Sequence, residues 1–139
     1  MSRPYRGGCA CGALRYEIKG EPVVMLDCQC RQCQRESGTG HASHLTFAGA
    51  EVLVEGESRS WDMVGDGGTR KRRAFCPVCG SPMFMTFPDM PNLFVVRAAS
   101  LDEPALYKPQ MVVWTDAAQP FDHVDPALPK FARMPPASG

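Results

Sequence analysis

Short stretches in which apolar and polar residues alternate dominate the chain and predict β-strands. The clearest stretch, residues 14–18, carries an apolar side chain at every second position, which places those side chains on one face of a strand. Glycine and proline mark turns between the stretches, as at residues 20–22 and 65–68. We therefore predict a mainly β protein of short antiparallel strands. Further strands are expected at residues 23–26, 44–47, 51–54, 59–63, 72–75, 83–87, 93–97 and 110–115.

One short helix and an irregular C-terminal segment complete the predicted organisation. We expect one to two helical turns near residues 30–37, with Asp27 as the N-cap and Gly38 as the stop signal. From Pro120 onward, repeated prolines exclude regular structure. We assign residues 1–133 to one domain and residues 134–139 to a flexible tail. An extended arm before this tail can be fastened to the domain by Phe121, Val124, Leu128 and Phe131.

Length and charge exclude several classes of protein. The chain has 139 residues, enough for one hydrophobic core and too few for two full domains. Its 15 Lys+Arg balance its 15 Asp+Glu, so no overall basic charge favours nucleic-acid binding. The 13 glycines and 13 prolines argue against a bundle of long helices. No apolar run approaches the roughly 18 residues of a membrane span, and no signal region follows the first residues, so we expect a cytoplasmic protein.

The cysteines carry the strongest chemical signal in the sequence. All 7 fall into three groups, and an odd number cannot all pair as disulfides. A chain without a signal peptide is expected where thiols stay reduced, which favours metal or thiol chemistry. The groups are a CxC pair at Cys9 and Cys11, a CxCxxC group at Cys28, Cys30 and Cys33, and a CxxC pair at Cys76 and Cys79.

The two outer groups have the form of metal-binding knuckles. A glycine, Gly12 or Gly80, follows the last cysteine of each group and can adopt the positive φ of a tight turn. Four thiolates around one Zn²⁺ make a closed tetrahedral site with no free position, which suits a structural role. We therefore assign a structural zinc to Cys9, Cys11, Cys76 and Cys79.

The middle group supplies three thiolates and no fourth cysteine. Three protein ligands plus one exchangeable position is the arrangement of catalytic zinc, so our first interpretation is an open zinc site on Cys28, Cys30 and Cys33. A thiol substrate suits such a sulfur-rich site because soft ligands prefer soft metals. Two alternatives remain open: His41 or His44 closes the shell and makes the site structural, or the cysteines are redox thiols without a metal.

Several motifs in order resemble a known family. The stretches GGCxCGAxRYE (residues 7–17), CxCxxCxxxSG (28–38) and FCxxCGSPMF (75–84) are followed by LDEP (101–104) and DPALPKF (125–131). This pattern resembles the glutathione-dependent formaldehyde-activating enzyme family, also called the GFA or CENP-V/GFA family. The resemblance implies an Mss4-like β-tent fold and two zinc ions per chain, held as assigned above. It also implies carbon–sulfur lyase activity that joins glutathione and formaldehyde as S-hydroxymethylglutathione.

Two positions depart from the family pattern, and the function has an alternative from another class. Gln29 stands where the middle motif often has histidine, and Phe121 stands where the family usually has tryptophan. Neither change removes a cysteine, although both can alter the pocket. The alternative function is a zinc-stabilised binding module for protein or nucleic acid, without catalysis.

Other polar and aromatic residues are weaker candidates for a role. Residues just after the middle cysteines are candidates for proton transfer: Glu36, Ser37, Thr39, His41 and His44, with His123 less favoured. The run Arg70, Lys71, Arg72 and Arg73 is first interpreted as a solvated strand edge, then as a binding site for glutathione carboxylates, and only third as a nucleic-acid patch. Core positions are expected for Trp61, Trp114, Phe75, Phe84, Phe87 and Phe94.

Overall fold

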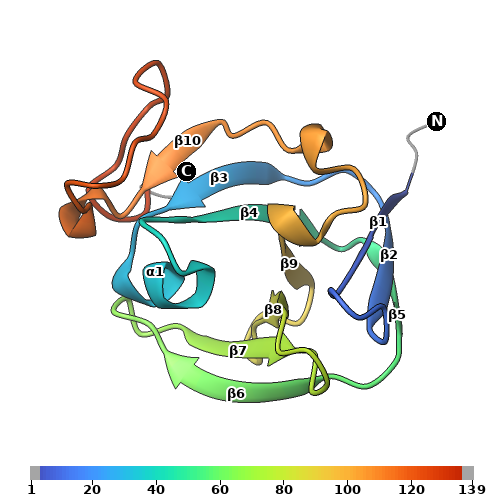
Figure 1. Ribbon diagram of the computed structural model, residues 1–139. Coiled ribbons are helices and arrows are strands. Elements are labelled where there is room, and N and C mark those ends of the chain that lie inside the picture. The colour runs from blue at the N-terminus through green and yellow to red at the C-terminus, as the bar shows by residue number, and fades with distance from the viewer. Residues whose placement is uncertain (1–3, 136–139) are drawn as a thin grey trace.

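A computed structural model describes residues 4–135 of the chain and contains two β-sheets and one α-helix (Figure 1). The smaller sheet has three antiparallel strands in the order β1-β2-β5, namely Tyr5–Gly8, Arg15–Lys19 and Glu51–Glu55. The larger sheet has seven strands in the order β10-β3-β4-β9-β8-β7-β6. These are, in that order, Met111–Val113, Val24–Cys28, Ala42–Ala48, Leu93–Arg97, Pro82–Thr86, Arg70–Phe75 and Arg59–Val64.

The predicted mainly β fold is confirmed, and each expected strand has a counterpart in the structure. Two features differ from the prediction. Strand β10 runs parallel to β3, whereas the other pairs of strands within residues 4–135 are antiparallel. Strand β1 was not predicted, because its sequence ends in two glycines, which have low strand propensity. It forms because each of its residues is paired with β2.

Alternation along the strands divides the buried side chains between the two faces of the larger sheet. On one face, Leu45, Phe47 and Val96 are fully buried and belong to the main core, together with Tyr16 and Ile18 of the smaller sheet. The opposite face carries a second cluster formed by Leu26, Cys28, Cys33, Ala42 and Val113. The two sheets thus pack against each other through one face of the larger sheet, and the cysteines of the CxCxxC group belong to the other face.

The helix α1 (Arg31–Ser37) begins and ends at residues with clear caps. Its N-cap is Cys30, whose Sγ accepts a hydrogen bond from the Cys33 backbone N–H at 3.3 Å. Gly38 ends it in the left-handed region with φ 77°, as predicted. The expectation that Asp27 is the N-cap was wrong. Asp27 belongs to β3, and its Oδ1 accepts hydrogen bonds from the hydroxyls of Ser43 and Tyr107.

A buried charge network attaches α1 to the larger sheet. The Glu36 carboxylate accepts hydrogen bonds from Arg73 of β7 and Arg97 of β9. The three side chains are 10%, 3% and 8% exposed, so their charges are largely removed from water and compensate one another. Figure 1 shows the resulting position of α1, between the ends of β3 and β4 on one side and β7 on the other.

The C-terminal segment and the aromatic residues follow the predictions only in part. Phe131 packs against the second cluster, and a bridge between Val112 and Lys130 attaches the segment to β10. Phe121 does not fasten the arm, because it is 63% exposed. Trp61 is likewise not a core residue, since it lies on the edge strand β6 and is 46% exposed. The proposed tail at 134–139 stays a prediction, and residues 136–139 lie outside the described part.

Between residues 4 and 135, no helix has the length and apolar character needed to cross a membrane.

The charge network gives a stability prediction. Glu36→Gln should lower the free energy of unfolding by about 3–5 kcal/mol, because it leaves two buried guanidinium groups without a compensating charge. Urea denaturation followed by circular dichroism measures this change. Asp62→Asn is the matched control: it breaks an exposed pair with Arg72 and should leave stability nearly unchanged. Equal, small effects of the two changes would contradict the structural role of Glu36.

Candidate metal centres

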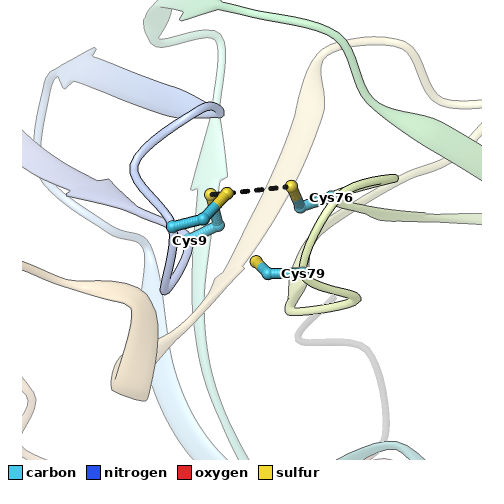
Figure 2. A group of neighbouring side chains, drawn as sticks. Cys9, Cys76 and Cys79 are labelled. Atoms are coloured by element: carbon cyan, nitrogen blue, oxygen red, sulfur yellow. Dashed lines mark hydrogen bonds between the residues drawn. The ribbon is translucent and has the colours of Figure 1, made fainter.

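The CxC and CxxC pairs meet and form the four-cysteine cluster of Cys9, Cys11, Cys76 and Cys79 (Figure 2). Their sulfur atoms all lie within 4.8 Å of one another. The Cys9–Cys11 and Cys11–Cys76 Sγ distances are 3.6 and 3.7 Å. Zn–S bonds of about 2.3 Å in a tetrahedron place the sulfurs about 3.8 Å apart. The spacing of this cluster therefore fits a tetrahedral zinc site.

Tight turns bring the sulfurs of this cluster together. Gly12 and Gly80 have φ values of 82° and 76°, a conformation that other residues rarely adopt. Each glycine N–H donates to the carbonyl of the first cysteine in its turn, Cys9 or Cys76. The Ser81 hydroxyl and backbone N–H lower the pKa of the Cys79 thiol to about 5. The turns thus present sulfur atoms, one of them with a strongly stabilised thiolate, to a common point.

The CxCxxC group forms the three-cysteine cluster of Cys28, Cys30 and Cys33, whose sulfurs also lie within 4.8 Å of one another. Cys28 ends β3, Cys30 caps α1, and Cys33 lies in the first turns of the helix. Hydrogen bonds from the Cys28 and Cys33 side chains lower the pKa of the Cys30 thiol, and the positive charge of Lys71 adds to the effect. The same bond to Cys30 raises the pKa of Cys28. Within the cluster, these contacts favour the thiolate form at Cys30 and disfavour it at Cys28.

His44 contacts the three-cysteine cluster as a hydrogen-bond donor. Arg97 Nη1 lies 2.9 Å from His44 Nδ1, and because a guanidinium can only donate, Nδ1 accepts. The proton of the neutral ring is then on Nε2, which lies 3.3 Å from Cys33 Sγ. Burial and the charges of Arg97 and Arg73 lower the pKa of His44 well below its usual value, which keeps the ring neutral. In this tautomer, Nε2 donates to sulfur and is not free to bind a metal.

Gln29 and His41 make contacts outside the three-cysteine cluster. Gln29 is 3% exposed, and its Nε2 donates to Asp122 Oδ2 at 2.9 Å. His41 Nδ1 lies 2.9 Å from the other oxygen of Asp122. In the described part of the chain, the cluster contains sulfur ligands alone. The alternative in which His41 or His44 completes the shell is therefore not supported by this geometry.

The three-cysteine cluster opens into a cavity of about 320 Å³, hereafter the cysteine cavity. Cys28, Cys33 and His44 line it, as do Lys71 and Arg73 of β7. A larger cavity of about 690 Å³ lies on the other side of the Glu36 network. Four of the sequence-derived candidates for proton transfer line this larger cavity instead: Glu36, Ser37, Thr39 and His41. We take the cysteine cavity as the candidate reaction site, because it alone of the two contacts the three-cysteine cluster.

Lys71 is a residue of the cysteine cavity that the sequence did not single out from its basic run. The run lies in β7, so its side chains alternate between the two faces. Arg70 and Arg72 form exposed ion pairs with Asp89 and Asp62, both at 2.8 Å. Arg73 pairs with Glu36 on the other face. Among residues 4–135, no carboxylate lies within ion-pair distance of Lys71, and this pairing pattern gives no support to a nucleic-acid patch.

The fold and its clusters define a class: a two-sheet β protein with two cysteine clusters compatible with zinc. The family model described as "Glutathione-dependent formaldehyde-activating enzyme" matches residues 4–117. The chain belongs to this GFA family, as the sequence motifs indicated.

One curated relative agrees with this family membership, and one solved structure shares the fold. A protein of Halomonas elongata, described as "Putative glutathione-dependent formaldehyde-activating enzyme", is 28% identical over 111 residues, which cover 76% of this chain and 71% of that protein. The crystal structure of a Rhodobacter sphaeroides protein superposes with a TM-score of 0.55 at 19% identity and covers 91% of this chain and 98% of that one. This second likeness concerns the fold.

The two clusters predict different consequences of losing one ligand. Cys79→Ser and Cys30→Ser should each lower the zinc content from about two ions per chain to about one. Cys79→Ser should also lower the melting temperature strongly, because its cluster joins distant parts of the chain and metal binding is coupled to folding. Cys30→Ser should keep the wild-type circular dichroism spectrum. Elemental analysis and thermal melting test this pair, and a Cys79→Ser protein with two zinc ions and an unchanged melting temperature would refute the assignment.

Proposed function

We propose that this chain is a carbon–sulfur lyase that joins a small thiol to a small aldehyde and also catalyses the reverse reaction. In the forward direction, the thiol sulfur forms a bond to the carbonyl carbon, the C=O π bond breaks, and the thiol proton ends on the carbonyl oxygen. The product is a hemithioacetal, which for glutathione and formaldehyde is S-hydroxymethylglutathione. The observation that carries this proposal is the three-cysteine cluster at the wall of the cysteine cavity.

The residues of the three-cysteine cluster fit a zinc ion that keeps one exchangeable position. Zinc bound there by Cys28, Cys30 and Cys33 supplies a cation beside which the thiolate form of a substrate is favoured near neutral pH. His44 positions Cys33 through the Nε2–H hydrogen bond to its sulfur, and Arg97 holds the ring in that orientation. Cys28 and Cys33 are buried, so both sulfurs are held by the surrounding fold.

Lys71 has the chemistry to stabilise the charge that develops on the aldehyde oxygen. Its side chain lines the cysteine cavity, and its charge is close enough to lower the pKa of Cys30. As the sulfur bonds to carbon, the carbonyl oxygen gains negative charge, and a Lys71 Nζ–H donated to it favours the transition state. The proton lost by the thiol then completes the new hydroxyl group.

With seven free cysteines among residues 4–135, we place the protein in a reducing compartment such as the cytoplasm.

The central test is the rate of hemithioacetal formation from glutathione and formaldehyde, followed by NMR. The wild-type protein should accelerate both adduct formation and its reversal above the rate in buffer. Cys30→Ser should return the rate to that of buffer, because it removes a ligand of the open site. The control is Ser43→Ala, which lies outside both clusters and should keep the wild-type rate. Cys11→Ser is not a suitable control, because it removes a ligand of the four-cysteine cluster. Acceleration that persists undiminished in Cys30→Ser would remove the basis of the proposal.

Substitutions of Lys71 and of its neighbour Arg70 form a matched pair that tests whether Lys71 stabilises the negative charge developing on the aldehyde oxygen. Lys71→Gln should lower kcat by about a hundredfold, the effect typical of losing one donor to a developing oxyanion. Arg70→Gln removes a positive charge from the other face of β7 and should leave kcat nearly unchanged. Steady-state kinetics of both variants, with zinc content matched, measure the difference. A similar small loss in both variants would assign Lys71 only a general electrostatic effect.

A further inference from the structure

We propose that the substrate carries an apolar group of several carbons that occupies the cysteine cavity, either on the thiol or on the aldehyde. This inference rests on the proposed function and concerns its substrate class. It goes beyond glutathione and formaldehyde, because neither presents such a group. The observations that support it are the composition of the cavity walls, their continuity with the three-cysteine cluster, the cavity volume and the charges present.

Strand register places an apolar surface next to the cluster. Residues paired across neighbouring antiparallel strands share one face of the sheet. Leu26 is paired with His44, so the leucine shares the face of the cysteine-contacting histidine. One row further along, Val24 is paired with Thr46, which in turn is paired with Val95. The row continues from Val95 to Met85. Val24, Leu26, Val95 and Met85 therefore form an apolar floor that begins at the cysteines, with His44 and Thr46 between them and Arg73 paired with Met85 at its far end.

Residues from outside the strand rows extend the apolar surface around this floor. Phe87 follows β8, and Trp114 follows β10 on the side of the second hydrophobic cluster. Both side chains line the cysteine cavity together with the floor residues. The main apolar residues of the walls are Val24, Leu26, Met85, Phe87, Val95 and Trp114. Apolar walls with a few polar groups at one end are the usual form of a small-molecule site.

The cavity is larger than the smallest aldehyde requires. Its volume of about 320 Å³ corresponds to roughly ten water molecules at about 30 Å³ each. Formaldehyde has two heavy atoms and leaves most of this volume to water against apolar walls, which is unfavourable. A chain or ring of several carbons fills the space and removes both surfaces from water.

The charges of the cavity do not match glutathione, which has two carboxylates and one ammonium group. The described walls contain two cations, Lys71 and Arg73, and one carboxylate, Asp66. Arg73 is already paired with Glu36, so Lys71 is the remaining cation of the walls. Lys71 belongs to β7 and lies on the face of the larger sheet that carries the three-cysteine cluster. One unpaired cation can serve a single developing negative charge. It does not balance two substrate carboxylates inside the apolar cavity, where unpaired charge is costly, so a glutathione bound through its sulfur would keep its carboxylates outside the cavity and leave the apolar space to another group.

Binding of a homologous series of thiols tests the inference without using activity. Ethanethiol, butanethiol and hexanethiol are titrated by calorimetry into the zinc-loaded protein at several temperatures. Affinity should increase about fourfold per added methylene until the cavity is filled. Binding should also show a negative heat-capacity change, the robust sign of apolar burial. Equal affinities along the series, with no heat-capacity change, would overturn the inference.

Val24 and Val23 offer a matched pair of variants for locating the site. Val24→Trp fills the cysteine cavity and should weaken hexanethiol binding at least tenfold. Val23→Trp makes the same change at an adjacent side chain that is 61% exposed and does not line the cavity, so binding should be unchanged. If Val24→Trp does not fold, Leu93→Phe narrows the same cavity by a smaller change at a partly buried position. Equal binding to the cavity and control variants would place the thiols elsewhere and refute the proposed site.

Rates with paired substrates decide which reactant carries the apolar group. Hexanethiol with formaldehyde, glutathione with hexanal, and glutathione with formaldehyde are compared, each relative to its uncatalysed rate. A larger acceleration for the first pair assigns the group to the thiol, and a larger one for the second assigns it to the aldehyde. Equal acceleration of all three pairs would contradict the apolar substrate class and leave the proposed function intact. Chain-length-dependent binding without acceleration of any pair would support the apolar site and contradict the lyase function.

Discussion

Four sulfur atoms from two distant turns set the constraint on which the arrangement of the two sheets depends. Cys11 and Cys76 are 65 positions apart in the sequence, and their sulfurs lie 3.7 Å apart. One turn follows β1 of the smaller sheet and the other follows β7 of the larger sheet. A metal ion bound by both turns would close a long loop and hold the sheets in register on their common core. The main hydrophobic core then has a fixed geometry, with Cys76 itself fully buried in it.

The buried charges on the other face of the larger sheet perform a second positioning task. Glu36 joins α1 to two strands. Arg97 donates hydrogen bonds to this carboxylate and to His44, and His44 in turn contacts Cys33. The side chain that orients a sulfur is thus itself oriented by an arginine whose charge is compensated. Because Arg97 can only donate, the network also fixes the tautomer of His44. The helix, the strands and the three-cysteine cluster are therefore held by one continuous set of hydrogen bonds.

The sequence predicted the strands and the grouping of the cysteines because both signals are local: alternation has a period of two, and a knuckle spans a few residues. It was less successful where partners distant in the sequence decide the outcome. Strand β1 forms through pairing with β2 and not through propensity. Glu36 and His41 were proposed for proton transfer because they follow the cysteines closely, yet both line the other cavity. Lys71 lines the cysteine cavity because successive side chains of β7 point to opposite faces of the sheet. Predicting this from the sequence would have required the boundaries of β7 and its partner strands.

The central claim is that the two clusters differ in kind: one is closed by four sulfurs, and the other has three sulfurs and an exchangeable position. Cadmium-113 NMR of the protein loaded with that isotope observes each site separately. The account predicts two resonances, of which only one moves when a small thiol is added, because only the three-cysteine cluster can accept a further sulfur ligand. A single resonance, or two resonances that both ignore the thiol, would contradict it.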